Sequence, residues 1–265
     1  MAKESIQAIK EALLTVTDAT DERLASWRED ERSGVQQAIK QWERRQLAKE
    51  KEWQLFKEMS QFEEAAYKKG HRLIAGIDEV GRGPLAGPVV TAAVILPKDC
   101  QLLGLNDSKK LSAKKRETLY NQIQEQAVAI GLGIADQGVI DQINIYQATK
   151  QAMKMAIDDL AFAPDYLLID AMQLDVPQPQ ESLIKGDARS ISIAAASIIA
   201  KVTRDRLMEE YDELYPGYGF KNNAGYGTKE HLLGLEKYGV TPIHRRTFAP
   251  IKDIPELLVN FKNEK

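Results

Sequence analysis

The chain has 265 residues, of which 43% are hydrophobic and 28% are charged, and its formal net charge at pH 7 is −3. This length is sufficient for one large domain with a sizeable core, or for a core with an appendage. No apolar run approaches the ~20 residues of a membrane span, and the mixed charges after Met1 differ from a signal peptide, which together argue against a membrane protein. The single cysteine, Cys100, excludes an internal disulfide and fits a reducing cytoplasm.

The charge and the histidines narrow the functional classes further. A net charge of −3 argues against an indiscriminate nucleic-acid binder, which is usually basic. It is compatible with a nuclease, because carboxylates that bind metal ions lower the net charge while lysines and arginines elsewhere contact phosphates. The three histidines lie far apart in the sequence, which disfavours a zinc site of the Cys/His type.

The first 70 residues differ in composition from the rest, because they contain no proline and only two glycines, Gly34 and Gly70. Residues 35–69 are rich in Gln, Glu, Lys and Arg and predict a helix, whereas residues 15–33 predict a break between two helices. We therefore expect a helical N-terminal extension over residues 1–70. Two roles are open for it: packing on the following domain, or binding nucleic acid or a partner through basic residues that interleave with aromatic ones.

Residues 71–265 show an α/β pattern and form the second predicted domain. An apolar strand at 73–77 is followed by a second at 89–96, too closely for a crossover helix, so the two are antiparallel. Further expected elements are strands at 127–135 and 166–169, helices at 112–126, 141–160 and 191–211, and a C-terminal helical segment (about 215–265) with a short helix at 228–238.

Four carboxylates lie at the ends of predicted elements. Asp78 and Glu79 follow the first strand, Asp170 follows the strand at 166–169, and Asp187 precedes the long helix. Neighbouring strand residues point to opposite faces, so Asp78 and Glu79 share one site only if the strand ends or bulges there. Each carboxylate alone is explained by a turn or a helix cap. Together they supply the hard oxygen ligands of Mg²⁺ or Mn²⁺, and two such ions can promote phosphodiester cleavage.

Five sequence blocks carry a family resemblance, and they are residues 73–88, 106–112, 185–205, 225–231 and 241–248. They occur in the order found in bacterial ribonuclease HII, a type 2 ribonuclease H, and the chain closely resembles that family over roughly residues 71–250. One such block would be weak evidence, whereas five in order are specific.

The resemblance implies a ribonuclease H-like α/β domain with a mixed sheet flanked by helices. It implies that Asp78, Glu79, Asp170 and Asp187 bind two Mn²⁺ or Mg²⁺ ions, with Asp78 bridging both ions and Asp187 completing the second site. The implied reaction cuts the RNA strand of RNA/DNA hybrids, and duplex DNA on the 5′ side of a single ribonucleotide. The products carry a 3′-hydroxyl and a 5′-phosphate.

The resemblance also implies that Gly81, Arg82 and Gly83, together with Tyr226, recognise the junction between a ribonucleotide and DNA. Glycines let backbone amides approach the 2′-hydroxyl that distinguishes RNA from DNA, and a tyrosine ring can stack on the next deoxyribose. Ser108 and Lys109 are expected near the phosphate backbone.

Other charged residues have simpler explanations. Lys201 and Arg204-Asp205 lie at helical spacing and predict an internal salt bridge. For His244 and Arg245-Arg246, contacts with phosphates are the minor alternative to a structural role.

Two rival functions differ from this prediction. Ribonuclease HIII is a sister enzyme with a different N-terminal domain, and the block at 81–88 favours ribonuclease HII over it. A catalytically silent module that binds hybrids is disfavoured by the four intact carboxylates. We expect a cytoplasmic monomer whose partners are RNA/DNA hybrid and ribonucleotide-containing duplex DNA.

Overall fold

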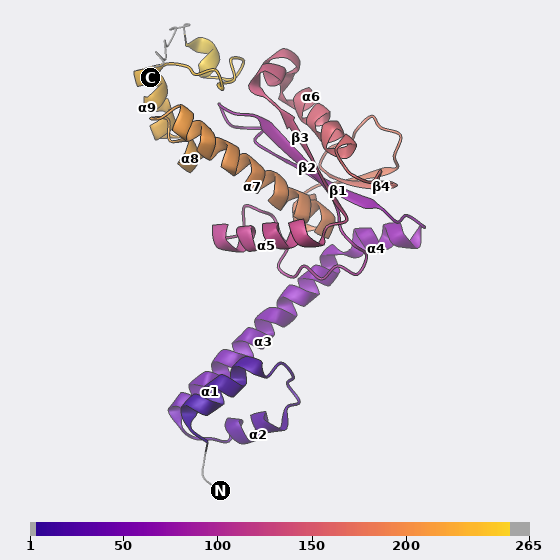
Figure 1. The fold of residues 1–265 in the computed structure, drawn as a ribbon, viewed down its shortest axis with the longest axis vertical. Coiled ribbons are helices and arrows are strands. Elements are labelled where there is room, and N and C mark those ends of the chain that lie inside the picture. Colours follow the sequence, from indigo (N-terminus) through magenta and orange to yellow (C-terminus); the bar gives the residue numbers. More distant parts are fainter. Residues whose placement is uncertain (1–3, 255–265) are drawn as a thin grey trace. The chain divides into compact units, whose positions relative to one another are not determined.

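The computed structural model describes residues 4–254, and the chain divides into two compact units, Met1–Lys57 and Glu58–Lys265. Figure 1 labels helices α1 to α9 and strands β1 to β4. Within the described residues, no helix has both the length and the apolar character that crossing a membrane requires.

The first unit is helical, as predicted, and contains α1 (Ile6–Thr15), α2 (Glu22–Arg28) and most of α3 (Ser33–Met59). Trp42 on α3 is buried, and its Nε1 donates a hydrogen bond of 2.8 Å to the carbonyl of Val16. Such a bond satisfies the polar group of a large apolar side chain in the core. The other buried residues of this core are Ile9, Leu13, Val16, Leu24, Trp27, Val35, Ala38 and Ile39.

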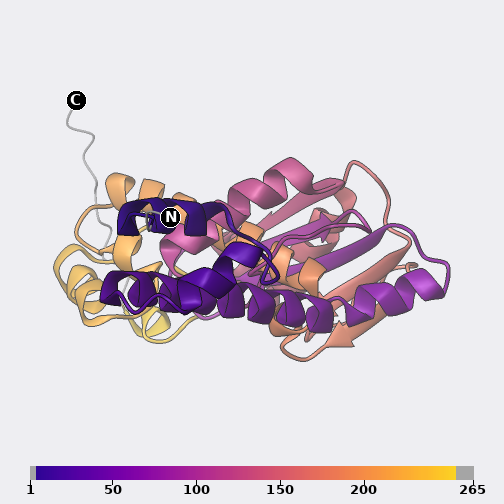
Figure 2. The same cartoon turned by 90° about the horizontal axis from the view of Figure 1, so that it is seen from below.

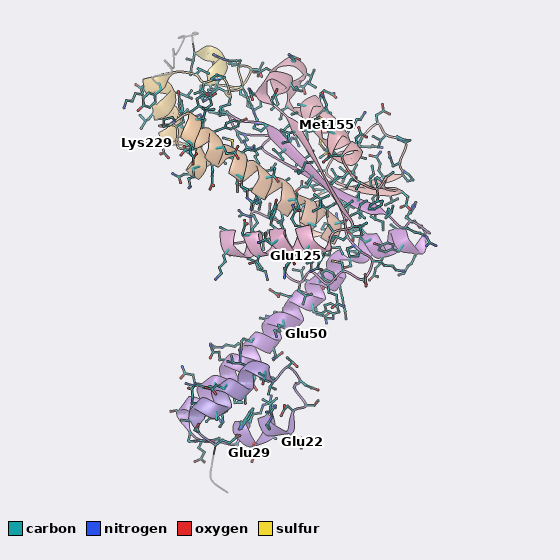
Figure 3. The ribbon with its side chains drawn as sticks, in the orientation of Figure 1. Glu22, Glu29, Glu50, Glu125, Met155 and Lys229 are labelled. Atoms are coloured by element: carbon teal, nitrogen blue, oxygen red, sulfur yellow. The ribbon has the colours of Figure 1, made fainter. Side chains whose placement is uncertain are left out.

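Residues 15–33 were predicted to be a break between two helices, without a helix of their own. This prediction is wrong, because α2 lies within them. This helix has only seven residues, and Glu22 and Glu29 lie at its two ends (Figure 3). Two turns are too few for a helical period to stand out in a sequence. Asp21 begins the helix by accepting a hydrogen bond from the backbone N–H of Arg23.

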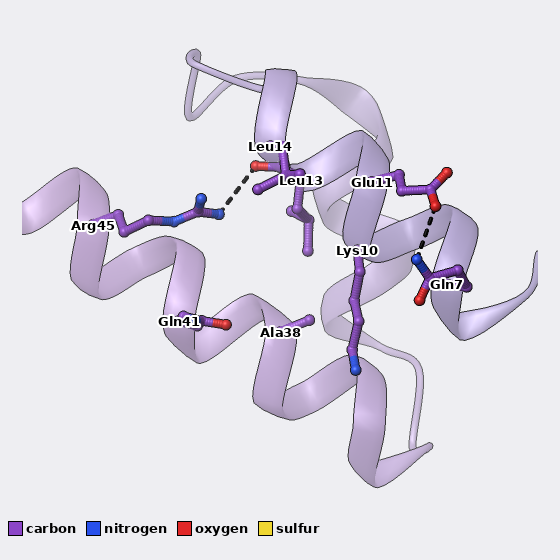
Figure 4. A pocket seen from close by; sticks show the side chains of 8 residues that line it. All are labelled: Gln7, Lys10, Glu11, Leu13, Leu14, Ala38, Gln41 and Arg45. Atoms are coloured by element: carbon purple, nitrogen blue, oxygen red, sulfur yellow. Dashed lines mark hydrogen bonds between the residues drawn. The ribbon is translucent and has the colours of Figure 1, made fainter.

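A shallow hollow of about 250 Å³ lies between α1 and α3 (Figure 4). Arg45 crosses it and donates a hydrogen bond of 3.2 Å to the carbonyl of Leu13. Glu11 on the same rim accepts a bond from Gln7. The rim therefore carries both signs of charge, and the hollow shows no preference for an anion or a cation.

The second unit is built on a mixed five-stranded sheet in the order β3-β2-β1-β4-β5. The pair β1–β2 is antiparallel, as expected for closely spaced strands. The pair β2–β3 is antiparallel as well, while β1–β4 and β4–β5 are parallel. The strands are β1 (Ile74–Val80), β2 (Val89–Ile95), β3 (Ala129–Ala135), β4 (Tyr166–Asp170) and β5 (Gln180–Leu183).

Helices cover both faces of this sheet, with α6 on one face and α7 on the other (Figures 1 and 2). The remaining helices lie around these layers and at the C-terminal end of the unit. The helices are α4 (Gln61–Lys68), α5 (Ala113–Gln126), α6 (Gln137–Asp158), α7 (Ile191–Leu214), α8 (Phe220–Asn223) and α9 (Lys229–Tyr238), with 3-10 turns η1 (Gly186–Ala188) and η2 (Ile251–Asp253).

Small residues let α7 lie directly on β1. A methyl group placed on Gly76 of β1 would lie 2.0 Å from the backbone carbon of Ser192, so only glycine permits this approach. Residues 194–196, all alanine, are completely buried in the same helix. The close approach determines where the α7 side chains lie above β1.

Several predicted boundaries need correction. The helix expected over 35–69 is interrupted at Ser60, which separates α3 from α4. Helix α6 begins at Gln137 instead of Asp141 and is kinked at Asn144, whose φ is 67°. The short elements β5 and α8 were not predicted, because four residues carry too little periodicity.

Candidate active site

The register of the sheet brings two carboxylates side by side. Strand β4 runs parallel to β1 with Ile169 opposite Ile77, so the next residues along the two strands are Asp170 and Asp78. Both point toward the α7 face, because side chains alternate along a strand and Ile74 and Leu168 pack against α7. The sheet therefore places one carboxylate beside another at the end of β4.

Glu79 lies beside this pair for a structural reason that differs from the one predicted from the sequence. Strand β1 neither ends nor bulges at Asp78, because pairing with β2 continues in regular register to Val80. The strand that ends is β4, whose last residue is Asp170. Because no β4 side chain lies beyond Asp170, there is space for the Glu79 side chain at this end of the strand. Ligand oxygens of Asp78, Glu79 and Asp170 all lie within 4.8 Å of one another.

These three carboxylates resist ionisation in the protein. Burial is the largest cause that raises the pKa of Asp78, and the charges of Glu79 and Asp170 raise it further. Burial likewise raises the pKa of Glu79 and of Asp170. Oε2 of Glu79 is buried and accepts no hydrogen bond from the residues that the structure describes. Clustered buried oxygens with an unsatisfied lone pair are what a divalent cation would stabilise, so this donor set fits Mg²⁺ or Mn²⁺.

Asp187 lies on the turn η1 next to this cluster, although its carboxylate is not among the oxygens within 4.8 Å of one another. Burial raises the pKa of Asp187, followed by the charges of Asp107 and Asp170. The same turn contacts the cluster through Gly186, whose N–H donates a bond of 2.6 Å to Asp170. The structure therefore places Asp187 beside the cluster but outside its tightest group.

Two cations face the carboxylates. The Arg82 guanidinium lies 3.4 Å from Oε1 of Glu79. The positive charge of Lys109 favours the ionised forms of Glu79, Asp170 and Asp187. Both cations reduce the repulsion among the acidic groups.

Ser108 is only 3% exposed, and its hydroxyl lies 2.9 Å from the hydroxyl of Ser197 on α7. Ser197 in turn hydrogen-bonds Asp78, which opposes the rise in its pKa. Of the two residues expected near the phosphate backbone, Lys109 thus acts on the carboxylates through its charge, whereas Ser108 is buried against Ser197.

The loop after β1 and the residue Tyr226 lie side by side. Gly81 has a φ of +94°, a conformation that residues with side chains rarely adopt. A methyl group placed on Gly83 would lie 3.4 Å from Cε1 of Tyr226, and Tyr226 is 48% exposed. We call residues 81–83 and Tyr226 the recognition surface, after the role that the family resemblance predicts for them.

Two buried arginines support this loop from below. Arg204 donates hydrogen bonds to the carbonyls of Ala86, Pro88 and Ala224. Arg245 donates to those of Gly81, Arg82 and Gly87.

The predicted salt bridge within the long helix is confirmed for Lys201 and Asp205, which lie 2.5 Å apart. The prediction is wrong for Arg204, because its guanidinium donates to backbone carbonyls instead. The alternative of phosphate contacts is wrong for His244 and Arg245, which are 1% and 0% exposed.

Sequence reasoning missed two residues at this site. Asp107 lies close to Asp187, and Ser197 lies beneath Asp78. Asp107 lies within a family block, but a carboxylate in a polar loop carries no distinct signal. Ser197 was detectable as a polar residue in a run of alanine and isoleucine, where an unsatisfied hydroxyl would be costly.

Comparison with known proteins identifies the class. The structure resembles that of ribonuclease H2 from Pyrococcus horikoshii, with a TM-score of 0.59 at 26% identity over 68% of this chain and 95% of that one. The fold is thus that of a ribonuclease H.

Sequence comparisons identify the family within the ribonuclease H class. The family model for ribonuclease HII matches residues 75–251, and the model for the ribonuclease HII N-terminal domain matches residues 5–67. A ribonuclease HII from Enterococcus faecalis is 99% identical over 254 residues, which cover 96% of this chain and 100% of the relative. One from Bacillus cereus is 58% identical over 254 residues, 96% of this chain and 99% of the relative. The chain belongs to the ribonuclease HII family and is an enzyme of the ribonuclease H type, which sets aside both rival functions.

The cluster predicts an unusual effect of Asp78→Asn on stability. A pKa that folding raises means that the carboxylate costs stability once the pH exceeds its unfolded value, near 4. At pH 7.5 in a chelator, the neutral amide should therefore raise the melting temperature, by about 2–4 °C for each kcal/mol relieved.

The measurement is a thermal melt with chelator and then with Mn²⁺. Mn²⁺ should stabilise the unsubstituted protein by mass action and the variant less. A variant that melts below the unsubstituted protein in chelator would contradict this account of the cluster.

Proposed function

We propose that this enzyme hydrolyses the RNA strand of RNA/DNA hybrids and cuts duplex DNA on the 5′ side of a single embedded ribonucleotide. The products would carry a 3′-hydroxyl and a 5′-phosphate. The observation that carries the proposal is the adjacency of two features: three carboxylates within 4.8 Å, and a recognition surface anchored directly after the strand that bears two of them.

In this proposal Asp78, Glu79, Asp170 and Asp187 hold two divalent ions, Mn²⁺ or Mg²⁺. When bound, such ions activate the attacking water and stabilise the leaving oxygen. The protein itself contributes orientation: Gly186 fixes the Asp170 carboxylate through a hydrogen bond of 2.6 Å. Lys109 contributes positive charge where a phosphate would approach the carboxylates.

The recognition surface supplies the choice of substrate. The Gly81–Gly83 backbone would meet the 2′-hydroxyl of the ribonucleotide at its exposed end, where the missing side chain of Gly83 leaves the backbone accessible. The half-exposed ring of Tyr226, in contact with Gly83, would stack on the deoxyribose that follows. Recognition of RNA and of the following DNA would then occur on two adjacent elements.

Asp170→Asn tests the catalytic assignment. Replacing a negative ligand by a neutral amide should reduce cleavage of a duplex with one ribonucleotide by several orders of magnitude in Mn²⁺, in line with loss of a group that the reaction requires. Binding of the duplex should persist, because repulsion of phosphate also decreases. Cleavage near the original rate would remove Asp170 from the site.

Tyr226→Ala and Tyr226→Phe test the stacking assignment. Stacking contributes ~1–3 kcal/mol by alanine substitution, or about one to two decades in rate or affinity. Alanine should therefore impair cleavage at a single ribonucleotide far more than phenylalanine, while a uniform RNA/DNA hybrid is affected less. Equal losses for both variants would assign the effect to the hydroxyl instead of the ring.

We further propose that the N-terminal arm (residues 1–57) contributes to substrate affinity. Lys40 and Arg44 are exposed on α3 and line a shallow hollow together with Gln37 and Gln41, with no carboxylate among the four. A patch of cations and amides is suited to a phosphate backbone.

Reversing two charges, Lys40→Glu with Arg44→Glu, should weaken binding of hybrid and leave kcat unchanged. The slope of log affinity against log salt should fall by about 0.9 for each lost phosphate contact. The control variant is Lys150→Glu with Lys154→Glu on α6, which lies on the sheet face opposite Asp78. It changes the net charge by the same amount as the variant on α3.

Folding of the arm can be followed separately, because all three tryptophans of the chain (Trp27, Trp42 and Trp53) lie within it. Equal affinity losses in the two charge-reversed proteins would show a general charge effect and refute a specific role of the arm.

A further inference from the structure

Two buried histidines lie directly behind the recognition surface. His231 on α9 and His244 in the C-terminal segment are 0% and 1% exposed, and their Nε2 atoms lie 2.9 Å apart. The rings of Tyr218 and Phe220 surround them, with centroids 5.1–6.1 Å away. In such an apolar cluster, a polar contact that is retained has to be fully satisfied.

Their partners fix the proton positions of both rings. The carbonyl of Tyr226 can only accept, so Nδ1 of His231, 2.9 Å away, carries a proton. The backbone N–H of Thr241 can only donate, so Nδ1 of His244, also 2.9 Å away, carries none. In neutral rings, Nε2 of His244 then donates to Nε2 of His231.

The result is a continuous chain of hydrogen bonds with a single direction, from Thr241 through His244 and His231 to the carbonyl of Tyr226. Burial lowers the pKa of His231, and burial and the neighbouring histidine lower that of His244 to about 3. Both rings are therefore neutral near pH 7, as the chain requires. A proton added to either ring would place two N–H groups against each other.

The neighbouring residue of His244 holds the other half of the recognition surface. The Arg245 guanidinium donates to the carbonyls of Gly81 and Arg82. The backbone N–H of Arg245 donates to the carbonyl of Leu85 at 2.9 Å. One short segment thus anchors the glycine loop directly and Tyr226 through the histidine chain. Tyr226 remains 48% exposed, so its side chain stays available while its carbonyl is held by His231.

We propose that His231 and His244 are positioning residues that hold Tyr226 at its working distance from the Gly81–Gly83 loop. This inference rests on the proposed role of Tyr226 in recognising the ribonucleotide–DNA junction. The histidines touch neither the carboxylate cluster nor, in this proposal, the substrate. Their loss should therefore alter the selectivity for a single ribonucleotide, and leave metal dependence unchanged.

Asparagine and glutamine can separate the two bonds of His231. In asparagine the amide lies where Nδ1 was, so His231→Asn can still donate to Tyr226 but cannot reach His244. In glutamine it lies where Nε2 was, so His231→Gln keeps the contact with His244 and loses Tyr226. Each variant loses one buried hydrogen bond, which makes them matched controls for stability.

The experiment compares kcat/KM on a duplex with one ribonucleotide and on a uniform hybrid, together with thermal melts. His231→Gln should lower the ratio of the two values on the order of tenfold, because small misplacements of a positioning group cost one to two decades. His231→Asn should keep most of the ratio. In a Tyr226→Ala background, His231→Gln should have no further effect on it.

Position 244 provides a crossed test, and an alternative if the variants at 231 do not fold. There His244→Gln keeps the donor toward His231 and should retain the selectivity, whereas His244→Asn keeps only the contact with Thr241 and should lose it. A general effect of either amide cannot produce this reversal.

The outcomes separate the two proposals. If Tyr226→Ala impairs single-ribonucleotide cleavage but the Asn and Gln variants at each position have equal ratios, the positioning inference is overturned and the proposed function stands. If Tyr226→Ala changes neither substrate, the recognition role of Tyr226 is overturned, and the inference with it.

Discussion

The parallel pairing of β1 with β4 is the constraint on which the site depends. It places Asp78 beside Asp170, and the end of β4 at Asp170 leaves space for the Glu79 side chain. A slip of one residue would turn Asp170 to the opposite face of the sheet, because strand side chains alternate. The apolar residues that fix this register, such as Ile77 and Ile169 in the α6-facing core, are therefore as necessary to the site as its carboxylates.

That geometry forces like charges together in a buried place, and the surrounding residues limit the cost. Lys109 and Arg82 supply positive charge, and Gly186 and Ser197 supply hydrogen bonds to Asp170 and Asp78. Burial, and after it the repulsion that remains, raises the pKa values of the three carboxylates. A site that is costly when empty gains more from a divalent cation, so the same arrangement that lowers stability favours metal binding.

Much of this was accessible from the sequence, because it depends on local patterns. Short apolar runs predicted β1 and β4, and the positions of Asp78 and Asp170 at the ends of those runs predicted their meeting. What failed depends on contacts between distant segments. The burial of Arg204 and Arg245 against backbone carbonyls is one example, since a carbonyl leaves no trace in a sequence. The position of the Glu79 carboxylate beside Asp78 and Asp170 is a second example, because it depends on β4 ending at Asp170.

The α7 end of the site also depends on a residue ahead of the first strand. Glu63 on α4 is buried and accepts hydrogen bonds from the hydroxyls of Ser190 and Ser192, and from the Ser192 N–H at 3.0 Å. Negative charge is stabilised at the start of a helix, and α7 begins four residues after Asp187. Burial nevertheless raises the pKa of Glu63, so desolvation outweighs these bonds. Because Ser190 also bonds to Gly186 through its N–H, Glu63 restrains the turn that carries Asp187. The structural basis of the carboxylate cluster thus begins in α4, before the first residue of the sheet.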